Sequence, residues 1–344
     1  MSVSTRPEVD GRYAKQVLFG PIGISGQEKL GKSSVAVIGL GALGTVVAGN
    51  LCRAGVGHLR LVDRDFVELS NLQRQILFDE EDARRRLPKV IAAAEKLGAI
   101  NSEVVIEPLI ADVAAGNVER VIAGCDLVLD GLDNMETRFL INDACVKTGT
   151  PWIYGGAVAS SGATMTIVPG KTACLRCLMG QVPAPGTMPT CDTVGVLAAT
   201  TGAVASIECA EALRLLTGHE PAGSILCIDI WDRDFRDLTI ERRPDCPACG
   251  AGEYEYLTGS RTSWTTVLCG RDAVQIVPPS EEELPLEDLG QRLARIGKVL
   301  YNGFLLSFEI GDLELVLFPT GRAIIRGTTD EAEARTIYAR YVGT

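Results

Sequence analysis

The sequence predicts an α/β protein with a doubly wound, mostly parallel sheet, an antiparallel half stapled by a metal, and a small C-terminal α+β module. Three observations predict this order. A glycine-rich turn at residues 39–44 joins an apolar run to a helical one. Short β-branched runs alternate with helical patterns as far as Gly155. Beyond that point apolar and polar residues alternate, and two Cys-x-x-Cys pairs follow.

The first half of the chain has the pattern of a Rossmann-like domain. Residues 1–30 form a polar arm with helical stretches. Buried strands are predicted at residues 34–38, 59–63, 103–108, 126–130 and 151–155, and helices between them at 43–54, 89–97 and 136–148. Strands that alternate with helices favour a parallel sheet with helices on both faces.

The second half changes character after Gly155. Residues 155–170 alternate, which predicts antiparallel strands, and a buried apolar helix at a domain or subunit interface is expected within 194–216. The polar stretch at 251–263 is interpreted as a linker. Beyond it, strands are predicted near residues 273–277, 304–310, 313–318 and 323–326, and helices near 286–296 and 330–341. We therefore expect two domains, residues 1–255 and 260–344.

The amino-acid composition indicates which classes of binding partner and which cellular compartment to expect. The 344 residues carry a net charge of −11, which disfavours nucleic acid as a partner because phosphate binding needs a basic face. No signal peptide is recognised, and the helix within 194–216 carries Glu208, Glu211 and Arg214, so we expect no membrane span. Eleven cysteines with two spaced pairs predict a reducing cytoplasm and a metal site instead of disulfides.

The turn after the first predicted strand has the spacing Gly39-x-Gly41-x-x-Gly44. Such glycines let the backbone approach phosphate, and the N-terminus of the following helix attracts the anion. Asp63 ends the next strand, where an acidic side chain can bind ribose hydroxyls. These residues predict an adenine nucleotide and leave NAD and ATP as alternatives.

A polar and cationic stretch after the second strand bears on that choice. Asn71, Arg74 and Lys89 suit a site that cleaves a triphosphate, because charge grows on the phosphate oxygens during the reaction. Asp130 and Asp133 end the fourth strand, where a carboxylate suits the Mg²⁺ that ATP carries. Each residue also has a structural alternative: Arg74 and Lys89 on a solvated helix face, and Asp133 as the cap of the next helix.

Two cysteine pairs predict a metal centre. Cys174 and Cys177, with Cys246 and Cys249, supply four thiolates for a closed tetrahedral zinc site that would pin the end of the first domain to its middle. No coordination position would remain open, so the role is structural. A redox Cys-x-x-Cys is the main alternative.

Cys191 lies in a loop rich in proline and threonine, where a reactive thiol and an incidental cysteine are both possible.

His58 and His219 pair with no plausible nucleophile in the sequence, which argues against a histidine-based hydrolase. Five cysteines are assigned to the core, and one has no assigned role: Cys52, Cys125, Cys145, Cys209 and Cys227, and then Cys269.

Taken together, the motifs resemble the ThiF/MoeB/HesA family, bacterial relatives of the ubiquitin-activating enzymes. "VAVIGLGALG", "LVDRDFVELSNLQRQ", "LPKV", "DLVLDGLDNMETR" and the two cysteine pairs occur in the family's order over about residues 10–250. The resemblance implies an enzyme, a cytoplasmic homodimer, that uses Mg-ATP to adenylate the terminal Gly-Gly carboxylate of a small ubiquitin-like sulfur carrier of the ThiS or MoaD type. The resemblance fits the thiamine pathway and the molybdenum cofactor pathway equally. It also implies a sulfur donor such as a cysteine desulfurase or rhodanese.

The resemblance also implies a role for each matching residue. Gly39, Gly41 and Gly44 would hold the nucleotide and Asp63 the ribose. Asn71, Arg74 and Lys89 would contact the phosphates, Asp133 would bind Mg²⁺ with Arg138 nearby, and the four paired cysteines would hold zinc. Cys191 matches the family's crossover-loop cysteine, which in some members forms a covalent link to the carrier or sulfur donor.

The chain departs from the family pattern in two places. Lys15 stands where the family's N-terminal motif has an arginine that reaches the neighbouring subunit's ATP site, and lysine keeps the charge but not the forked hydrogen bonding. Residues 260–344 extend beyond the family core as an accessory module. Two other functions remain as alternatives, an NAD-dependent oxidoreductase and a non-catalytic zinc-stapled nucleotide-binding protein.

Overall fold

The computed structural model describes residues 11–183, 189–258, 265–268, 273–277 and 284–342. The chain divides into two compact units. Unit 1 contains Met1–Arg84 and Pro88–Arg261, and unit 2 contains Arg85–Leu87 and Thr262–Thr344. Three residues of the N-terminal half therefore belong to the C-terminal unit, which no sequence pattern predicted.

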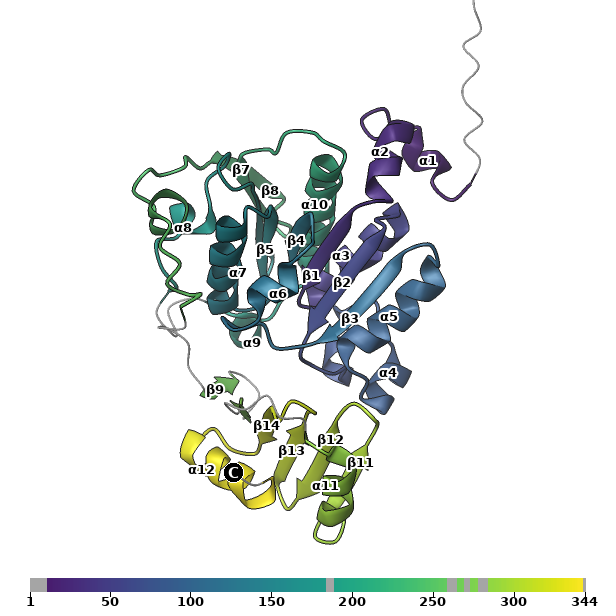
Figure 1. The fold of residues 1–344 in the computed structure, drawn as a ribbon, viewed down its shortest axis with the longest axis vertical. Coiled ribbons are helices and arrows are strands. Elements are labelled where there is room, and N and C mark those ends of the chain that lie inside the picture. The colour runs from purple at the N-terminus through teal and green to yellow at the C-terminus, as the bar shows by residue number, and fades with distance from the viewer. Residues whose placement is uncertain (1–10, 184–188, 259–264, 269–272, 278–283, 343–344) are drawn as a thin grey trace, which may run out of the picture. The chain divides into compact units, whose positions relative to one another are not determined.

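Unit 1 is built on an eight-stranded sheet with the order β3-β2-β1-β4-β5-β6-β7-β8 (Figure 1). β1 to β5 are parallel, and β6 to β8 continue the sheet antiparallel. This confirms the predicted doubly wound sheet with an antiparallel half. The strands are β1 (Ser34–Ile38), β2 (His58–Asp63), β3 (Val105–Ile110), β4 (Leu127–Asp130), β5 (Trp152–Val158), β6 (Ser161–Ile167), β7 (Ser224–Asp229) and β8 (Asp234–Thr239).

Helices cover both faces of this sheet. α3 and α10 pack against each other on one face, whereas α6 and α7 pack together in front of the strands in Figure 1. The helices of unit 1 are α1 (Ala14–Val17), α2 (Gly23–Leu30), α3 (Ala42–Ala54), α4 (Glu80–Arg85), α5 (Lys89–Ile100), α6 (Val118–Ile122), α7 (Met135–Thr148), α8 (Leu175–Leu178), α9 (Cys191–Val194) and α10 (Ala198–Leu216), with short turns η1 (Leu69–Asn71) and η2 (Pro247–Ala251).

The strand order creates a switch point at β1. The chain runs from β1 to β2 and β3 on one side, and then crosses from β3 to β4, which lies on the other side of β1. Because β1, β2 and β4 are parallel, the loops that follow them emerge at the same edge of the sheet. Ligands of open α/β sheets bind outside the carboxyl ends of the strands at such a point. The predicted nucleotide residues follow these three strands.

One sequence-based expectation about unit 1 is corrected. The predicted linker does not start at residue 251, because Tyr256 is buried against Phe139 and its backbone N–H donates to Asp143; residues 259–263 lie outside the described part. The apolar helix α10 packs on α3, β5 and β6 of unit 1, and its place at a domain or subunit interface stays a prediction.

Unit 2 is a six-stranded antiparallel sheet with the order β11-β12-β13-β14-β10-β9. Its two helices share one apolar core with the sheet, which includes Phe308, Leu315 and Ile325. The elements are β9 (Thr265–Leu268), β10 (Ala273–Ile276), α11 (Leu286–Leu293), β11 (Lys298–Tyr301), β12 (Leu306–Ile310), β13 (Leu313–Leu317), β14 (Ala323–Arg326) and α12 (Glu331–Tyr341).

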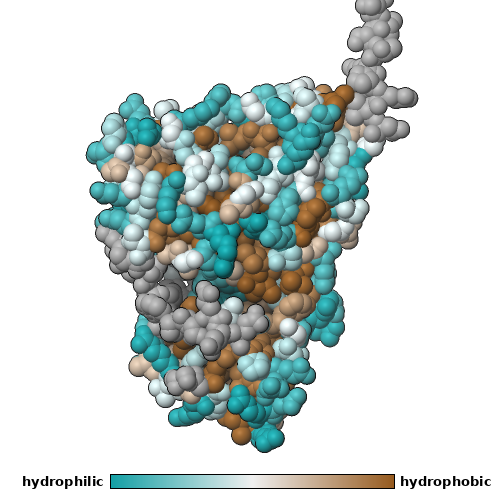
Figure 2. All heavy atoms as spheres, in the orientation of Figure 1, coloured by the Kyte–Doolittle hydropathy of each residue, from teal (hydrophilic) through white to brown (hydrophobic). Residues whose placement is uncertain are grey.

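The surface is of mixed polarity. Hydrophilic and apolar residues are interspersed on the face that Figure 2 displays, as is usual for folded proteins. Among the described helices, none has both the length and the apolar character that a membrane crossing requires.

Candidate functional site

The glycine turn fits between the ends of β1, β2 and β4. The Gly39 N–H donates to Val62 O (2.7 Å), and the Gly131 N–H donates to Ile38 O (2.8 Å). α3 begins directly after Gly41, and no side chain caps its N-terminus. The first N–H groups of this 13-residue helix therefore point toward the carboxyl edge of the sheet, where they can receive an anion.

Glycine is required at three positions by close packing. A Cβ on Gly44 would lie 1.8 Å from Gly39 O, and one on Gly39 would lie 2.6 Å from Gly131 O. Gly131, in the loop after β4, has the same constraint, because its Cβ would lie 2.1 Å from Gly39 O. Gly131 was not identified from the sequence; the only available signal was a glycine directly after a predicted strand.

Asp63 ties the glycine turn to β2. Its Oδ2 accepts the Leu40 N–H (2.6 Å) and its Oδ1 accepts the Asp65 N–H (2.7 Å). Burial raises the pKa of the Asp63 carboxyl, and the nearby Lys89 ammonium opposes that shift. The carboxyl thus contacts the glycine turn directly and lies within electrostatic range of Lys89, and its contact with a ribose stays a prediction.

Lys89 is buried at the start of α5. Its side chain is 6% exposed, and its Nζ lies 3.7 Å from Asp65 Oδ2. The Lys89 N–H donates to Asp65 O (2.9 Å), which fixes the first turn of the helix to the loop after β2. The alternative of a solvated helix face is therefore wrong for Lys89, and its ammonium is directed into the protein.

Arg138 shapes the β4 loop from within. Its Nε donates to Asp130 Oδ2 (2.8 Å), and its Nη2 donates to the carbonyls of Leu132 (2.7 Å) and Gly155 (2.6 Å). The guanidinium also lies 5.2 Å from the centre of the Tyr154 ring. Since these donors contact protein groups, the geometry favours a positioning role for Arg138 over direct nucleotide binding.

Asp133 is exposed at the end of the same loop. It does not cap α7, because the Asn134 side chain accepts the Thr137 N–H and is the cap. Burial acts to lower the pKa of Arg64, but the carboxylates of Asp112, Asp65 and Asp133 raise it. Asp133 therefore acts electrostatically on Arg64, the residue that follows β2, and its exposed side chain is accessible to a cation.

Asn71 and Arg74 form the turn that follows β2. The buried Asn71 side chain accepts the Glu68 N–H (3.0 Å), which closes η1. Arg74 is half-buried, and its Nη1 donates to Ser70 O (2.9 Å). Within the part of the chain that the structure describes, no hydrogen bond or ion pair joins Arg74 to the glycine turn, so its phosphate contact stays a prediction.

Cys191 and Lys15 lie apart from these contacts. Cys191 is the first residue of α9, and its Sγ contacts Ala157 O (3.3 Å). Lys15 is exposed on α1 and makes no hydrogen bond or ion pair within the described residues. Within the described residues, no hydrogen bond or ion pair joins Lys15 to the glycine turn, and the reported contact of Cys191 is with β5.

The expectation that His58 pairs with no nucleophilic side chain is corrected. His58 Nδ1 lies 2.8 Å from Ser34 Oγ, and its Nε2 lies 3.1 Å from Glu107, so a serine, a histidine and a carboxylate do meet. They lie where β1 and β2 begin, at the edge opposite the glycine turn. Glu107 is also paired with Arg60 (2.9 Å), and the trio accordingly belongs to the packing of the strand starts.

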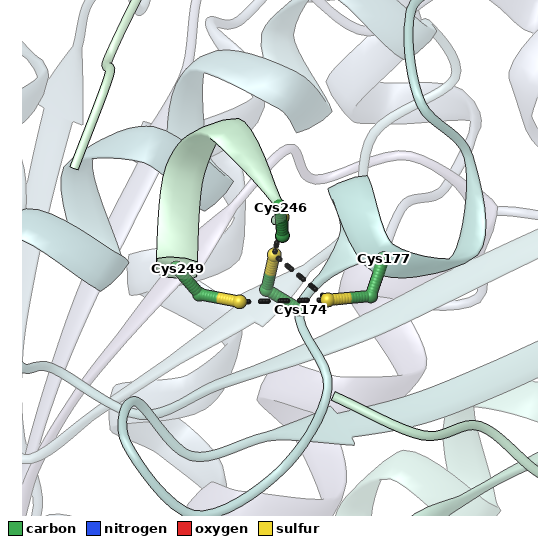
Figure 3. A group of neighbouring side chains, drawn as sticks. All are labelled: Cys174, Cys177, Cys246 and Cys249. Atoms are coloured by element: carbon green, nitrogen blue, oxygen red, sulfur yellow. Dashed lines mark hydrogen bonds between the residues drawn. The ribbon is translucent and has the colours of Figure 1, made fainter. Parts of the chain in front are cut away.

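The four paired cysteines converge as predicted (Figure 3). Their sulfur atoms all lie within 4.8 Å of one another. Contacts join Cys174 to Cys177 (3.9 Å), Cys174 to Cys246 (3.6 Å) and Cys177 to Cys249 (3.4 Å). Three of the four residues are buried, and Cys249 is half-buried.

This geometry fits a tetrahedral zinc ion. Thiolates at about 2.3 Å from the metal lie about 3.8 Å apart, which the observed sulfur spacing approaches. All four sulfurs share one centre, whereas a redox pair needs only two. The ten described cysteines are free of disulfides, and Cys269 lies outside the described residues. Cys52, Cys125, Cys145 and Cys209 are buried as expected, but Cys227 is only half-buried.

Comparison with protein families and curated proteins agrees with this arrangement. Residues 13–248 match the model of the ThiF family. The chain is 42% identical to the sulfur carrier protein ThiS adenylyltransferase of Bacillus subtilis, over 97% of this chain and 99% of that protein. The match therefore extends into unit 2. The Escherichia coli protein of the same name is 40% identical over 70% of this chain and 94% of its own length.

Solved structures share the fold over most of the chain. A crystal structure of E. coli MccB with ATP aligns with a TM-score of 0.63 and 23% identity, covering 70% of this chain and 75% of that chain. At this identity the likeness concerns the fold alone.

Proposed function

Because the chain belongs to the ThiF family, we propose that it is an adenylyltransferase that activates a small sulfur carrier protein with ATP. The observation that carries this proposal is the 42% identity, over almost the full length of both chains, to a sulfur carrier protein ThiS adenylyltransferase. The substrate would be a ubiquitin-like carrier that ends in Gly-Gly, of the ThiS type first and the MoaD type second.

The proposed reaction joins the carrier's terminal carboxylate to AMP. A carboxylate oxygen attacks the α-phosphorus of ATP, the bond from that phosphorus to the bridging oxygen breaks, and pyrophosphate leaves with the electron pair. No protein nucleophile is needed, because the carboxylate is already ionised. Catalysis then comes from positioning and from charge stabilisation.

Each residue of the site has a proposed task. The N–H groups at the start of α3 receive phosphate, and Asp63 binds the ribose hydroxyls. Lys89 and Arg74 stabilise the charge that grows on the phosphate oxygens. Asp133 would hold the Mg²⁺ that ATP carries, which shields the phosphate charge when bound. A cysteine desulfurase or a rhodanese would supply the sulfur that displaces AMP.

The first test is carrier-dependent exchange of radiolabelled pyrophosphate into ATP. The wild-type protein should catalyse this exchange only with a carrier that ends in Gly-Gly. Arg74→Ala and Asp133→Ala should each reduce the rate about a hundredfold or more, because they remove transition-state contacts. Arg335→Ala, at an exposed arginine on α12, is the matched control and should retain the wild-type rate.

Two results would contradict the proposal. Full exchange in both site variants would show that these residues do not act on ATP. A melting temperature raised by NAD but not by Mg-ATP would favour a dinucleotide enzyme instead.

Pyrophosphate exchange measured with ThiS and MoaD side by side distinguishes the two carrier types by their kcat/KM.

A further inference from the structure

A three-residue segment connects unit 2 to the nucleotide site. The chain leaves unit 1 at the last residue of α4, belongs to unit 2 over Arg85–Leu87, and rejoins unit 1 at Pro88. Arg86 has a φ of 49°, in the left-handed region that residues with a side chain rarely adopt. Leu87 is buried. The segment therefore has a defined conformation that its surroundings must maintain.

An ion-pair network holds Arg86. Its Nη1 donates to Ser307 Oγ (2.9 Å) and pairs with Glu314 Oε1. The other oxygen of Glu314 pairs with Arg326 (3.0 Å), and Ser307 donates to the same carboxylate (2.8 Å). Arg86 and Glu314 each have side chains that are 18% exposed. Charge-assisted bonds at such partly buried positions are stronger than those on an open surface.

Asn302 holds the backbone of the same segment. Its Nδ2 donates to the carbonyls of Arg85 (3.0 Å) and Arg86 (2.9 Å). Its Oδ1 accepts the N–H groups of Phe304 and Leu305 (both 3.0 Å), which closes the turn before β12. One side chain thus joins a turn of unit 2 to both carbonyls of the segment.

The next residues lead directly to the predicted phosphate site. Pro88 follows Leu87 and forms an isolated bridge with Phe66, and Lys89 is the first residue of α5. Two residues, Leu87 and then Pro88 with its fixed φ, therefore separate Arg86 from Lys89. Few rotatable backbone bonds lie between the segment and Lys89, so a displacement of the segment should also displace Lys89.

We propose that unit 2 is a positioning element for the nucleotide site, in which Glu314 and Asn302 hold Arg85 and Arg86 and thereby fix the start of α5 and the ammonium of Lys89. This assigns a task to the accessory module. It rests on the proposed function only in taking Lys89 as a ligand of the ATP phosphates.

The test compares two glutamates of the same sheet. Glu314→Gln weakens the hold on Arg86, whereas Glu309→Gln removes an exposed pair with Lys298 (2.9 Å) and is the matched control. Hydrogen–deuterium exchange of peptides covering residues 85–95 should become faster in Glu314→Gln and stay unchanged in Glu309→Gln. Equilibrium dialysis should show ATP binding about two- to thirtyfold weaker in Glu314→Gln alone.

Two further variants separate positioning from general damage. Asn302→Asp keeps the acceptor that closes the turn of unit 2 but loses the donors to the segment, and it should reproduce the effect with an unchanged melting temperature. In a Lys89→Ala background, Glu314→Gln should weaken ATP binding no further.

Faster deuterium exchange that is confined to peptides after residue 284 and leaves residues 85–95 unchanged would overturn the inference. Equal losses of ATP affinity with and without the Lys89 side chain would do the same. Deuterium exchange and ATP dialysis need no carrier, so they give a result even if the carrier-dependent reaction fails.

Discussion

A buried carboxyl group beside the β4 loop is the least expected residue of unit 1. Glu208 lies in the middle of α10, and both of its oxygens lack a hydrogen-bond partner within the described residues. A Cβ on Gly155 would lie 1.5 Å from Glu208 Oε1, so the carboxyl rests directly on the backbone of β5. Arg138 donates to the Gly155 carbonyl and to Asp130. Glu208 therefore belongs to the packed layer that supports the loop of Asp133.

Glu208 should make stability fall as pH rises. Burial and the neighbouring Asp130 raise its pKa well above the usual value, and Arg138 opposes them. Above pH ~4.3 the unfolded chain loses this proton while the folded chain retains it, so the unfolding free energy falls by about 1.4 kcal/mol per pH unit up to the folded pKa. Glu208→Gln removes the titration, and at pH 8 it should be more stable than wild type by on the order of 1–3 kcal/mol.

Urea unfolding at pH 5 and pH 8 checks this prediction. The difference between Glu208→Gln and wild type should grow with pH. Glu220→Gln, at an exposed glutamate just past α10, should follow the wild type at both values. A difference that is constant, or that shrinks with pH, would mean that Glu208 is ionised in the folded protein.

At the level of residues, the sequence predicts the glycine turn because its geometry is local. Gly39 and Gly44 meet each other across one turn of chain, and their spacing is visible in the sequence. Gly131 meets the same turn from a loop about ninety residues away, so its requirement for glycine depends on the sheet order. The partners of Glu208 and Arg86 are equally distant in sequence, and no local pattern marks them.

Among the elements, four strands were not predicted, and three of them, β8, β9 and β11, lie at sheet edges, whereas β7 is an interior strand. All residues of β8 and β11 are exposed or half-exposed, so these strands lack the apolar alternation of a half-buried strand. Pairing with β7 and β12 defines them instead. The buried strands β1 and β4 were predicted within a residue, since their apolar runs are continuous. β3 tolerates Pro108 because it is the other edge of the sheet.

The short elements α8 and η2 should depend on zinc for their stability. They supply the four cysteines from segments 69 positions apart in sequence (246 − 177) and have few residues of their own. We expect about one zinc per chain by elemental analysis, and loss of it on chelation or in Cys249→Ser. The melting temperature should fall by roughly 5–15 °C. Because thiolates are the ligands, acidification should also release the metal.

Cys227→Ser is the control for the zinc prediction, since Cys227 is a free thiol outside the cluster and half-exposed on β7. It should retain both the metal and the melting temperature. A protein that is equally stable with and without zinc, or a disulfide within either pair after purification under reducing conditions, would contradict the structural role.

At the scale of the whole molecule, the described part of the N-terminal arm exposes apolar side chains. Leu18, Phe19 and Ile24 on and beside α1 and α2 are each at least half exposed, and Lys15 lies on the same arm. A C2 dimer would cover this face with its equivalent or with another part of the partner. We expect a homodimer in which Lys15 of one subunit completes the phosphate site of the other.

Subunit mixing tests this expectation. Lys15→Ala and Arg74→Ala should each lower pyrophosphate exchange, because each removes a cation from every site. In a refolded equal mixture, half of the dimers are mixed and each has one intact site, so about a quarter of the wild-type activity should return. Lys15→Arg, which restores the forked donor, should match or exceed wild type. Mixtures that stay as inactive as their components would place Lys15 in its own subunit's site, or outside the site altogether.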